Sequence, residues 1–375
     1  MPNSTDVAIV GGGIIGCSIA YSLAKRGIKS VVFERESFAC GASGATAGMF
    51  TPLWHVDHAN EALFEMGMRS LDMIPRLAAE LDEAGIDPLF RQCGLLKVAM
   101  NSEESDTLRH DLIWQAELGI GVRWMDASEV IERVPGINPG VRGGVFSPTE
   151  GHVTGQRMVE SLVHAATRLG ATFLEGVEVN GLMTEDGQRV TGVRTARGNH
   201  PAGHTVIASG PWTGLTDGLM SERIPVRAVK GQRILLRKQG LLPEFIVHSF
   251  RGTSVPQPDG SILVAATRHE GEFDRNITVD AITAILSNAT HILPALSDAV
   301  FIGARAGVRP GSPDDVPIIG PVPGWNGVSV ASGHDGCGVM LSPGTAELMS
   351  GYIDTGNSSA LEPFSPARFS SPSTA

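Results

Sequence analysis

A glycine-rich turn near the N-terminus carries the clearest chemical signal in the chain. Gly11, Gly13 and Gly16 satisfy the pattern Gly-x-Gly-x-x-Gly between the apolar run 6–10 and a segment with helical spacing. In that context the first glycine makes the turn, the second lets a pyrophosphate approach the backbone, and the third lets helix and strand pack closely. The free N–H groups of the helix N-terminus, at Ile14 and beyond, favour phosphate oxygens. The pattern predicts a dinucleotide site.

An acidic residue follows where such a site needs one. Glu34 comes directly after a second apolar run, 30–33, where a carboxylate accepts hydrogen bonds from ribose hydroxyls. The alternative, an ordinary glycine turn of an α/β protein, does not require strand, helix and acid together. The motif by itself does not distinguish FAD from NAD, so a nicotinamide-linked dehydrogenase stays open at this point.

Two further segments have the composition of ligand contacts. Residues 41–49 are almost all small, which suits a backbone that lies against a flat ligand, although a flexible surface loop has the same composition. Residues 333–340 form a second strand–turn–helix junction, which could equally be a structural glycine turn. Cys337 lies there and could be taken for a covalent attachment point, but a free cysteine near a helix start is more often a small buried residue.

The histidines do not make a metal site. His55 and His58 are spaced like metal ligands beside Asp57, but no third ligand lies nearby, so we predict no metal. We assign no catalytic base, neither to these two residues nor to His334.

Alternating strand and helix patterns predict an α/β fold with a Rossmann-type domain and a smaller α+β substrate domain built on a mixed sheet. The first domain is expected to be discontinuous, at residues 1–88, 145–223 and 301–354. The second is expected at 89–144 and 224–300. The Ser- and Pro-rich segment 355–375 is expected to be disordered.

The composition of the chain argues against some classes of binding partner. The chain has 375 residues and a formal net charge of −11, which argues against nucleic acid or an anionic membrane as a partner. Four cysteines without a Cys-x-x-Cys pair suit a reducing compartment. We recognise no signal peptide and no transmembrane segment, so we expect a cytoplasmic protein.

In order along the chain from Asp6 to Tyr352, the sequence resembles the D-amino-acid oxidase-like family of FAD enzymes, most closely the glycine oxidases. The matching segments are 10–16, 33–34, 45–49, 208–212, 230–231, 309–312, 317–320, 333–334 and 338. The resemblance implies non-covalent FAD and a substrate domain over the flavin.

The resemblance also assigns residues to the cofactor and the substrate. Besides the glycine turn and Glu34, those implied at FAD are Ile14, Ile15, Arg35, Ala42, Ser43, Ala47, Gly48, Met49, Val179, Gly210, Trp212, Gly333, His334, Asp335, Gly336, Gly338, Val339 and Met340. Arg309 is implied to hold the substrate carboxylate, which suits the planar fork of a guanidinium.

Three positions depart from the glycine-oxidase pattern. Thr253 replaces a tyrosine, Gly336 replaces an arginine, and Arg268 replaces a methionine. Glycine itself is therefore in doubt as the substrate. Arg268 could be a replacement carboxylate anchor, could receive a second acidic group, or could point to solvent. We expect Arg309, Arg268, Met49 and Thr253 at the substrate.

The resemblance implies oxidation of a small amino acid or N-substituted amino acid. Hydride passes from Cα to flavin N5, the imine hydrolyses, and oxygen reoxidises the flavin to give hydrogen peroxide. An acceptor other than oxygen, used by a dehydrogenase or by a subunit of a multi-chain dehydrogenase, is the alternative. A homo-oligomer stays open.

Overall fold

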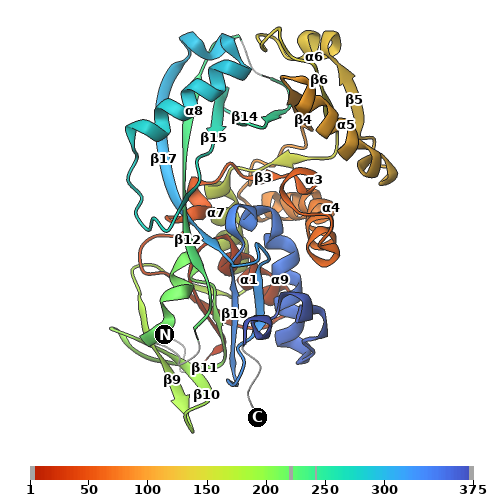
Figure 1. Ribbon diagram of the computed structural model, residues 1–375. Coiled ribbons are helices and arrows are strands. Elements are labelled where there is room, and N and C mark those ends of the chain that lie inside the picture. Colours follow the sequence, from red (N-terminus) through yellow and green to blue (C-terminus); the bar gives the residue numbers. More distant parts are fainter. Residues whose placement is uncertain (1–4, 219–222, 241–242, 371–375) are drawn as a thin grey trace.

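The computed structural model describes residues 5–218, 223–240 and 243–370, and Figure 1 shows two β-sheet bodies, one above the other. The lower body in that view is built on an eight-stranded sheet. Its strands are β1 (Thr5–Val10), β2 (Ser30–Phe33), β8 (Thr172–Leu174), β9 (Val179–Glu185), β10 (Arg189–Thr195), β11 (Gly198–Ile207), β18 (Ile318–Pro321) and β19 (Val328–Ser332). Its long helices are α1 (Ile14–Lys25), α4 (Glu61–Ala84), α7 (Gly155–Arg168) and α9 (Gly338–Thr355).

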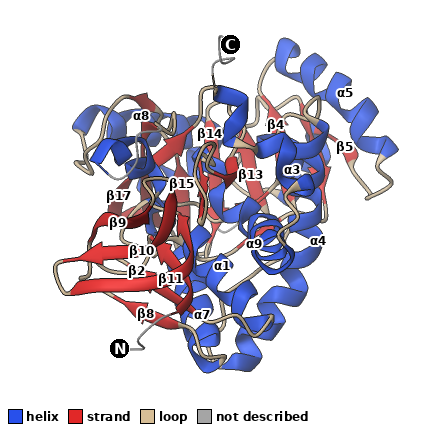
Figure 2. Ribbon diagram, turned by 90° about the horizontal axis from the view of Figure 1, so that it is seen from below, coloured by secondary structure: helices blue, strands red, loops and turns tan. Residues whose placement is uncertain are grey.

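This first sheet is parallel at its centre. The strand order is β18-β19-β11-β1-β2-β8, in which only β18 runs antiparallel to its neighbour. Helices α1, α7 and α9 cover one face, and an antiparallel ribbon of β9 and β10 covers the other (Figure 2). Short apolar strands that are buried on both faces are what a parallel sheet requires.

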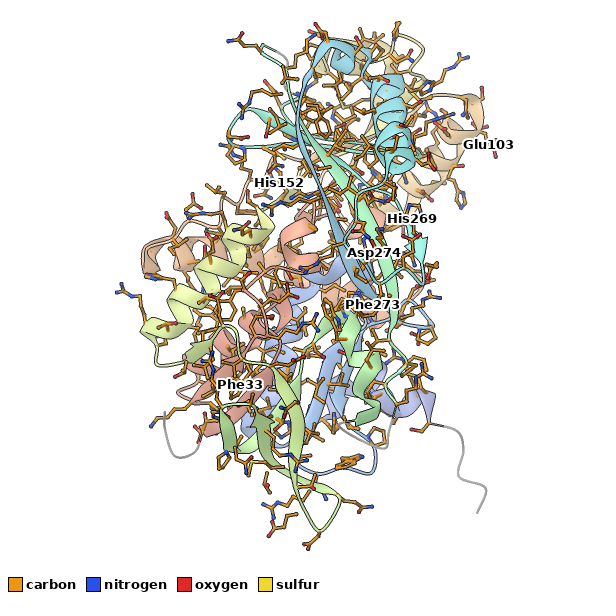
Figure 3. The ribbon with its side chains drawn as sticks, turned by 90° about the vertical axis from the view of Figure 1, so that its left-hand side faces the viewer. Phe33, Glu103, His152, His269, Phe273 and Asp274 are labelled. Atoms are coloured by element: carbon orange, nitrogen blue, oxygen red, sulfur yellow. The ribbon has the colours of Figure 1, made fainter. Side chains whose placement is uncertain are left out.

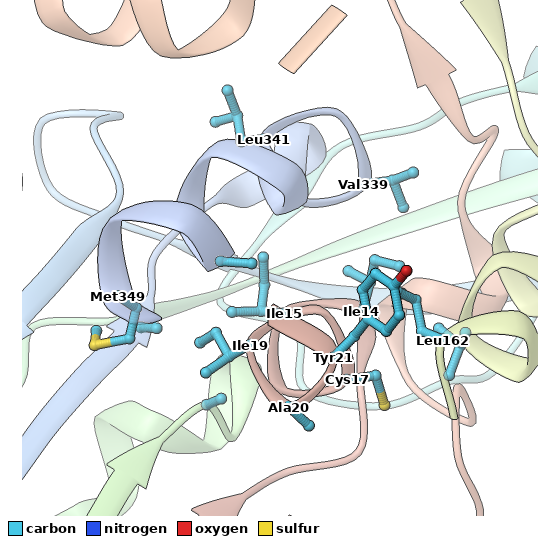
Figure 4. Close-up of a cluster of buried hydrophobic side chains, with 14 of the residues drawn as sticks. Ile14, Ile15, Cys17, Ile19, Ala20, Tyr21, Leu162, Val339, Leu341 and Met349 are labelled. Carbon is cyan, nitrogen blue, oxygen red and sulfur yellow. The ribbon is translucent and has the colours of Figure 1, made fainter. Parts of the chain in front are cut away.

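Helix α1 is fixed by burial on all sides. Figure 4 shows its side chains between Leu162 of α7 and the side chains of α9, among them Leu341 and Met349. Ten of its twelve residues are buried, and Cys17 and Ile19 have no exposed surface. A helix that is apolar all round belongs inside a protein. Its N-terminus is therefore held in one place, beside the carboxyl end of β1.

The upper body is built on a nine-stranded sheet. Its strands are β4 (Leu95–Ala99), β5 (Arg123–Asp126), β6 (Gly143–Ser147), β12 (Arg227–Arg237), β13 (Ile246–Ser249), β14 (Gly252–Pro256), β15 (Ser261–Ala265), β16 (His269–Glu270) and β17 (Val300–Gly311). Its helices are α5 (Ser102–Glu117), α6 (Ala127–Arg133) and α8 (Val279–Ile292). The pairing of β13 with β4 is parallel and the other pairings are antiparallel, so the predicted mixed sheet is confirmed.

Short elements complete the chain. They are α2 (Ala42–Ala45), α3 (Pro52–His55), the strand pair β3 (Met49–Phe50) and β7 (Gly151–His152), and the 3₁₀ turns η1 (Gly210–Gly218), η2 (Pro294–Asp298), η3 (Asp335–Cys337), η4 (Ser359–Phe364) and η5 (Pro366–Phe369). Across the described ranges, no helix combines the length and the apolar content that a membrane crossing requires.

Two predicted domain boundaries disagree with the sheets. Strand β17 pairs with β12 along its whole length, so residues 301–311 belong to the second sheet and not to the first domain. Strand β6 likewise places residues 145–147 in the second sheet. Both strands run straight through the expected boundary, and no change of composition marks where they end.

The expected disorder of segment 355–375 is wrong for residues 359–369. Leu361 and Phe364 are 1% and 3% exposed in the core of the first body, and the Arg368 guanidinium is 2.8 Å from Asp314. Two apolar anchors and one ion pair order a segment whose Ser and Pro content predicts disorder. Residues 371–375 lie outside the described residues.

Candidate cofactor and substrate site

A cavity of about 1160 Å³ runs between the two sheets and brings the predicted site residues together. Small-molecule sites usually measure about 300–1,000 Å³, so this cavity has room for a dinucleotide with a small substrate. The predicted residues that do not line it are Gly16 and Gly333. The remainder line it, from Glu34 and Val179 at one end to Arg309 and Thr253 at the other.

The glycine turn leaves space where the motif requires it. A Cβ on Gly16 would lie 2.1 Å from the carbonyl oxygen of Gly11, so this glycine serves helix–strand packing and not the cavity wall. A Cβ on Gly13 would have one neighbour within 4 Å, Ser43 Oγ at 3.2 Å, and would otherwise enter the cavity. Gly11 has a φ of +114°, which favours glycine.

The Glu34 carboxylate closes this turn. Its Oε2 accepts a hydrogen bond from the N–H of Gly12 at 2.8 Å, and its Oε1 accepts from the N–H of Glu36 at 2.9 Å. A carboxylate offers about four lone-pair sites, so two remain for ribose hydroxyls. Nearby, the Arg35 guanidinium lies 4.0 Å from the centre of the Trp212 ring. Val179 lines the same end of the cavity at the start of β9.

The small-residue segment is held from the second sheet by two arginines that the sequence analysis did not single out. Arg233 of β12 donates to the carbonyl oxygens of Ala45 (2.8 Å) and Gly44 (3.3 Å). Arg305 of β17 donates to Gly44 at 3.2 Å. Burial and the neighbouring Arg305 lower the pKa of Arg233 to about 10. The backbone of this segment is thereby fixed along the cavity wall.

At the opposite end lies Arg309, in β17. Its guanidinium donates to the carbonyl oxygen of Thr267 at 3.1 Å, and burial lowers its pKa. Among the described residues, no carboxylate lies within 4.0 Å of it. Gly231 makes room for it, since a Cβ there would lie 2.3 Å from Nη2 of Arg309. A buried cation beside a cavity is a candidate anchor for an anionic group.

Arg268 is not a free cation. It forms ion pairs with Asp335 and with Glu270, the second at 2.9 Å. The expectation that it is a replacement carboxylate anchor, or that it receives a second acidic group of the substrate, disagrees with this pairing. The expectation that it points to solvent holds only in part, because the side chain is 45% exposed yet lines the cavity.

Thr253 joins a polar wall that includes two histidines. Its Oγ1 lies 2.6 Å from Nδ1 of His248, and the His248 ring lies 5.1 Å from that of His55, centre to centre. Nδ1 of His55 is 2.8 Å from Oγ1 of Thr51. Burial lowers the pKa of His55 to about 4 and lowers that of His248 well below the usual value. Both rings are therefore neutral at pH 7, and the wall offers uncharged hydrogen-bonding groups.

Three observations bear on other site hypotheses. Burial raises the pKa of Cys337 to about 12, and its Sγ contacts the carbonyl oxygen of His55 at 3.3 Å. The ring of His58 stacks on Trp114, 4.3 Å away, and does not join His55. In the part of the chain that the structure describes, no group of three or more His, Cys, Asp or Glu side chains is arranged to hold a metal.

Sequence reasoning missed cavity residues that belong to no recognisable motif. They are Arg233 of β12, Thr51 at the N-cap of α3, and the 265–266 pair at the end of β15. Their positions carried no signal, because each reaches the cavity only through the packing of its segment against distant parts of the chain.

The residues present fit FAD. The space beside Gly13, the start of α1 and the Glu34 carboxylate match a pyrophosphate and a ribose, and at that helix start the N–H of Ile14 donates to Ser43 Oγ at 2.9 Å. The fixed 42–49 backbone matches a flat ring system.

Comparison with known proteins agrees with this geometry. The family model described as "FAD dependent oxidoreductase", DAO, matches residues 6–351. The chain is 32% identical over 373 residues to a glycine oxidase of Geobacillus kaustophilus, with 98% of both chains covered.

Two solved structures have the same fold. The crystal structure of glycine oxidase from Geobacillus kaustophilus superposes with a TM-score of 0.93 at 31% identity, covering 98% of this chain and all of that one. The structure of L-proline dehydrogenase from P. horikoshii superposes with a TM-score of 0.88 at 25% identity, covering 98% of each.

Proposed function

The chain belongs to the DAO family of FAD-dependent oxidoreductases, and on this premise we propose that it oxidises the C–N bond of a small amino acid or N-substituted amino acid. It is glycine oxidase-like over nearly its full length. The imine product would hydrolyse to an oxo acid and ammonia or an amine. Oxygen would take up the two electrons and two protons, giving hydrogen peroxide.

The main observation behind this proposal is the environment of Arg309. Arg309 is a buried guanidinium, forms no ion pair within 4.0 Å among the described residues, and lines the cavity that the glycine turn also lines. A desolvated cation calls for an anionic partner, since an unpaired buried charge is costly. The carboxylate of an amino acid meets that need, and a bidentate pair would fix the orientation of Cα.

The chain's own residues prepare the reaction by positioning. Arg309 would hold the carboxylate, and the polar wall of Thr51, His55 and Thr253 would line the space for the remainder of the substrate. The segment 42–49, held by Arg233 and Arg305, would fix the cofactor's ring system. FAD, when bound, supplies the acceptor for the hydride that leaves Cα. Holding the reacting atoms in one geometry can lower a barrier by about 7–11 kcal/mol.

One similar structure supports an electron acceptor other than oxygen. The similar structure from P. horikoshii is a dehydrogenase, while the similar structure from Geobacillus kaustophilus is an oxidase, so this fold serves both kinds of enzyme. An acceptor other than oxygen is therefore the alternative to peroxide formation. The four free cysteines support the further proposal of a reducing, cytoplasmic compartment.

The test is a panel of amino acids and N-substituted amino acids scored without oxygen. A substrate should bleach the flavin absorbance of the purified holoenzyme within seconds to minutes. Mixing the bleached enzyme with oxygen should restore the colour and release one peroxide per flavin. If no member of the panel bleaches the flavin, the proposed substrate class is wrong. Bleaching that oxygen does not reverse would favour the alternative acceptor.

A further inference from the structure

The ion pair between Arg268 and Asp335 leaves half of a carboxylate without a partner. Arg268 bonds Oδ2 of Asp335 and also bonds Glu270. The other oxygen, Oδ1, is buried and has no hydrogen-bond partner among the described residues. The Asp335 side chain is 15% exposed and lines the cavity. An unsatisfied buried acceptor is costly, and more so when it is charged.

Asp335 lies beside Arg309. A β-bridge joins Gly311, two residues after Arg309, to His334, one residue before Asp335. On the other side, a Cβ on Gly336 would lie 3.9 Å from Nε of Arg309. The attraction between the two charges also raises the pKa of Arg309 against the effect of its burial. Arg309 and Asp335 therefore line the same part of the cavity, and the buried Oδ1 of Asp335 has no hydrogen-bond partner among the described residues.

Arg268 explains why these two groups do not simply pair with each other. It fixes Oδ2 of Asp335 from the side of Glu270, so no ion pair forms between Asp335 and Arg309 within 4.0 Å. Asp335 also has a φ of +44°, in a region that Asp and Asn tolerate better than most residues. The ion pair with Arg268 therefore fixes the position of Oδ2 of the Asp335 side chain.

We infer that Asp335 binds the amino group of the substrate, while Arg309 binds its carboxylate. The site would then bind both charged groups of a zwitterion. This inference rests on the proposed function. An α-amino acid carries an anionic carboxylate and a cationic ammonium group one carbon apart, which matches the guanidinium of Arg309 and, once the Asp335 side chain turns Oδ1 into the cavity, the unpartnered oxygen of Asp335. The resemblance implied Asp335 at the cofactor, and Asp335 lies in η3, directly before α9. The side chain, by this inference, serves the substrate.

The test uses two ligands of the same shape that cannot react. 2-Aminoisobutyrate and 2-hydroxyisobutyrate lack a hydrogen on Cα, so they cannot be oxidised by hydride loss, and they differ only in the amino group. Binding to the holoenzyme is measured by the change in flavin absorbance. Wild type should bind the amino acid at least about tenfold more tightly, a difference of about 1.4 kcal/mol.

Asp335→Asn keeps the shape and tolerates the positive φ, and removes the charge. It should lose most of the preference for the amino acid while its affinity for the hydroxy acid changes less than about threefold. Asp335→Gly, which also fits the backbone, serves as a second variant if the first loses FAD.

Two results overturn the inference. One is a wild type that binds the two ligands equally or binds neither. The other is an Asp335→Asn protein whose two affinities change by the same factor, as a purely structural role would cause. These failures differ from failure of the proposed function, in which no amino acid bleaches the flavin of the wild type at all.

Discussion

At the scale of single residues, the site depends on glycines, which leave space, as much as on charged side chains. Gly13 and Gly231 each leave a space of about one side chain, the first facing the cavity and the second occupied by the Arg309 guanidinium. Arg309 is available in turn because no carboxylate of the described chain lies within 4.0 Å of its guanidinium. Substitutions at these positions should therefore act on one ligand at a time.

Gly13→Val should weaken FAD binding at least about 100-fold, because the branched side chain would enter the space that suits the pyrophosphate. The measurement is the FAD content of the purified protein, followed by titration of the apoprotein. Gly303→Val is the matched control, since a Cβ at Gly303 has no neighbour within 4 Å. A fully loaded Gly13→Val protein would show that the turn does not hold the cofactor.

Arg309→Ala should lower kcat/KM for an amino acid by about 2–5 kcal/mol of transition-state binding, because one partner of a buried charge pair is lost. Arg309→Lys keeps the charge and loses the planar fork, so its loss should be smaller. FAD content should hardly change. The readout is wild-type preference for an amino acid over its decarboxylated amine, which Arg309→Ala should abolish. If both proteins show the same preference, Arg309 does not bind the carboxylate.

At the scale of elements, the pairing of β12 with β17 builds the substrate end. Gly231 pairs with Gly307, and Val229 pairs with Arg309, so the guanidinium lies over the glycine of the neighbouring strand. Gly307 is close-packed too, since a Cβ there would lie 2.7 Å from the Cβ of Ala45. The two glycines lie opposite each other on one face of the strand pair, where they make room for the small-residue segment and for the arginine.

Gly231→Ala tests this arrangement. The added Cβ would overlap the guanidinium of Arg309 and displace it by an ångström or more. Misplacement of that size can cost about 100-fold in rate, so we expect kcat/KM to fall about 10- to 100-fold. Gly303→Ala, on the open part of β17, is the control. Full activity of Gly231→Ala would mean that the guanidinium has another position available to it.

The charged segment 268–274 contacts both bodies next to the site. Lys230 of β12 is buried and pairs with Glu272 (3.0 Å) and Asp274 (2.8 Å), and Phe273 packs edge-on against Trp212. Figure 3 shows Phe273 and Asp274 close to His269 on one side of the molecule, along the stretch that follows β15. Arg268 lies at the start of this stretch. The ion pairs of Lys230 with the same stretch therefore help to fix Arg268, which in turn holds Asp335 in place.

At the scale of the whole molecule, buried neutral histidines make the fold sensitive to acid. Burial lowers the pKa of His152 to about 4, and both of its ring nitrogens lack partners in the described chain. The unfolded chain titrates such a histidine near 6.5 and so binds more protons between pH 6.5 and 4. The free energy of unfolding therefore falls as pH falls through that window.

His152→Leu should reduce this acid loss. The histidine has no exposed surface, and its shift corresponds to about 3 kcal/mol at pH values below both pKa values. The measurement is the midpoint of denaturant unfolding from pH 7.5 to 4.5, for wild type and variant. The variant should lose less stability over the range than wild type. Parallel curves would show that His152 does not titrate differently on unfolding.

The cofactor should be non-covalent in the complete protein. Acid precipitation should leave the yellow colour in the supernatant, because the Cys337 thiol is buried and its high pKa disfavours the reactive thiolate. Cys337→Ala should give the same result. A yellow pellet from wild type, with colour released from Cys337→Ala, would show covalent attachment at that residue.

The sequence by itself determined the elements whose signals are local. The apolar run 30–33 has the bounds of β2, and the glycine turn lies between β1 and α1 as expected. Such features follow from apolar spacing and from glycine, both of which act over a few residues.

Only the tertiary structure decided which distant residues meet. The ion pair of Arg268 with Asp335 and the space that Gly231 gives to Arg309 depend on strand register and on the packing of segments that lie far apart in the sequence. The sequence singled out Arg268 as a departure, but whether its charge was free depended on a residue 67 positions away. A residue's neighbours in sequence carry no information about that partner, because the contact exists only once both sheets have formed.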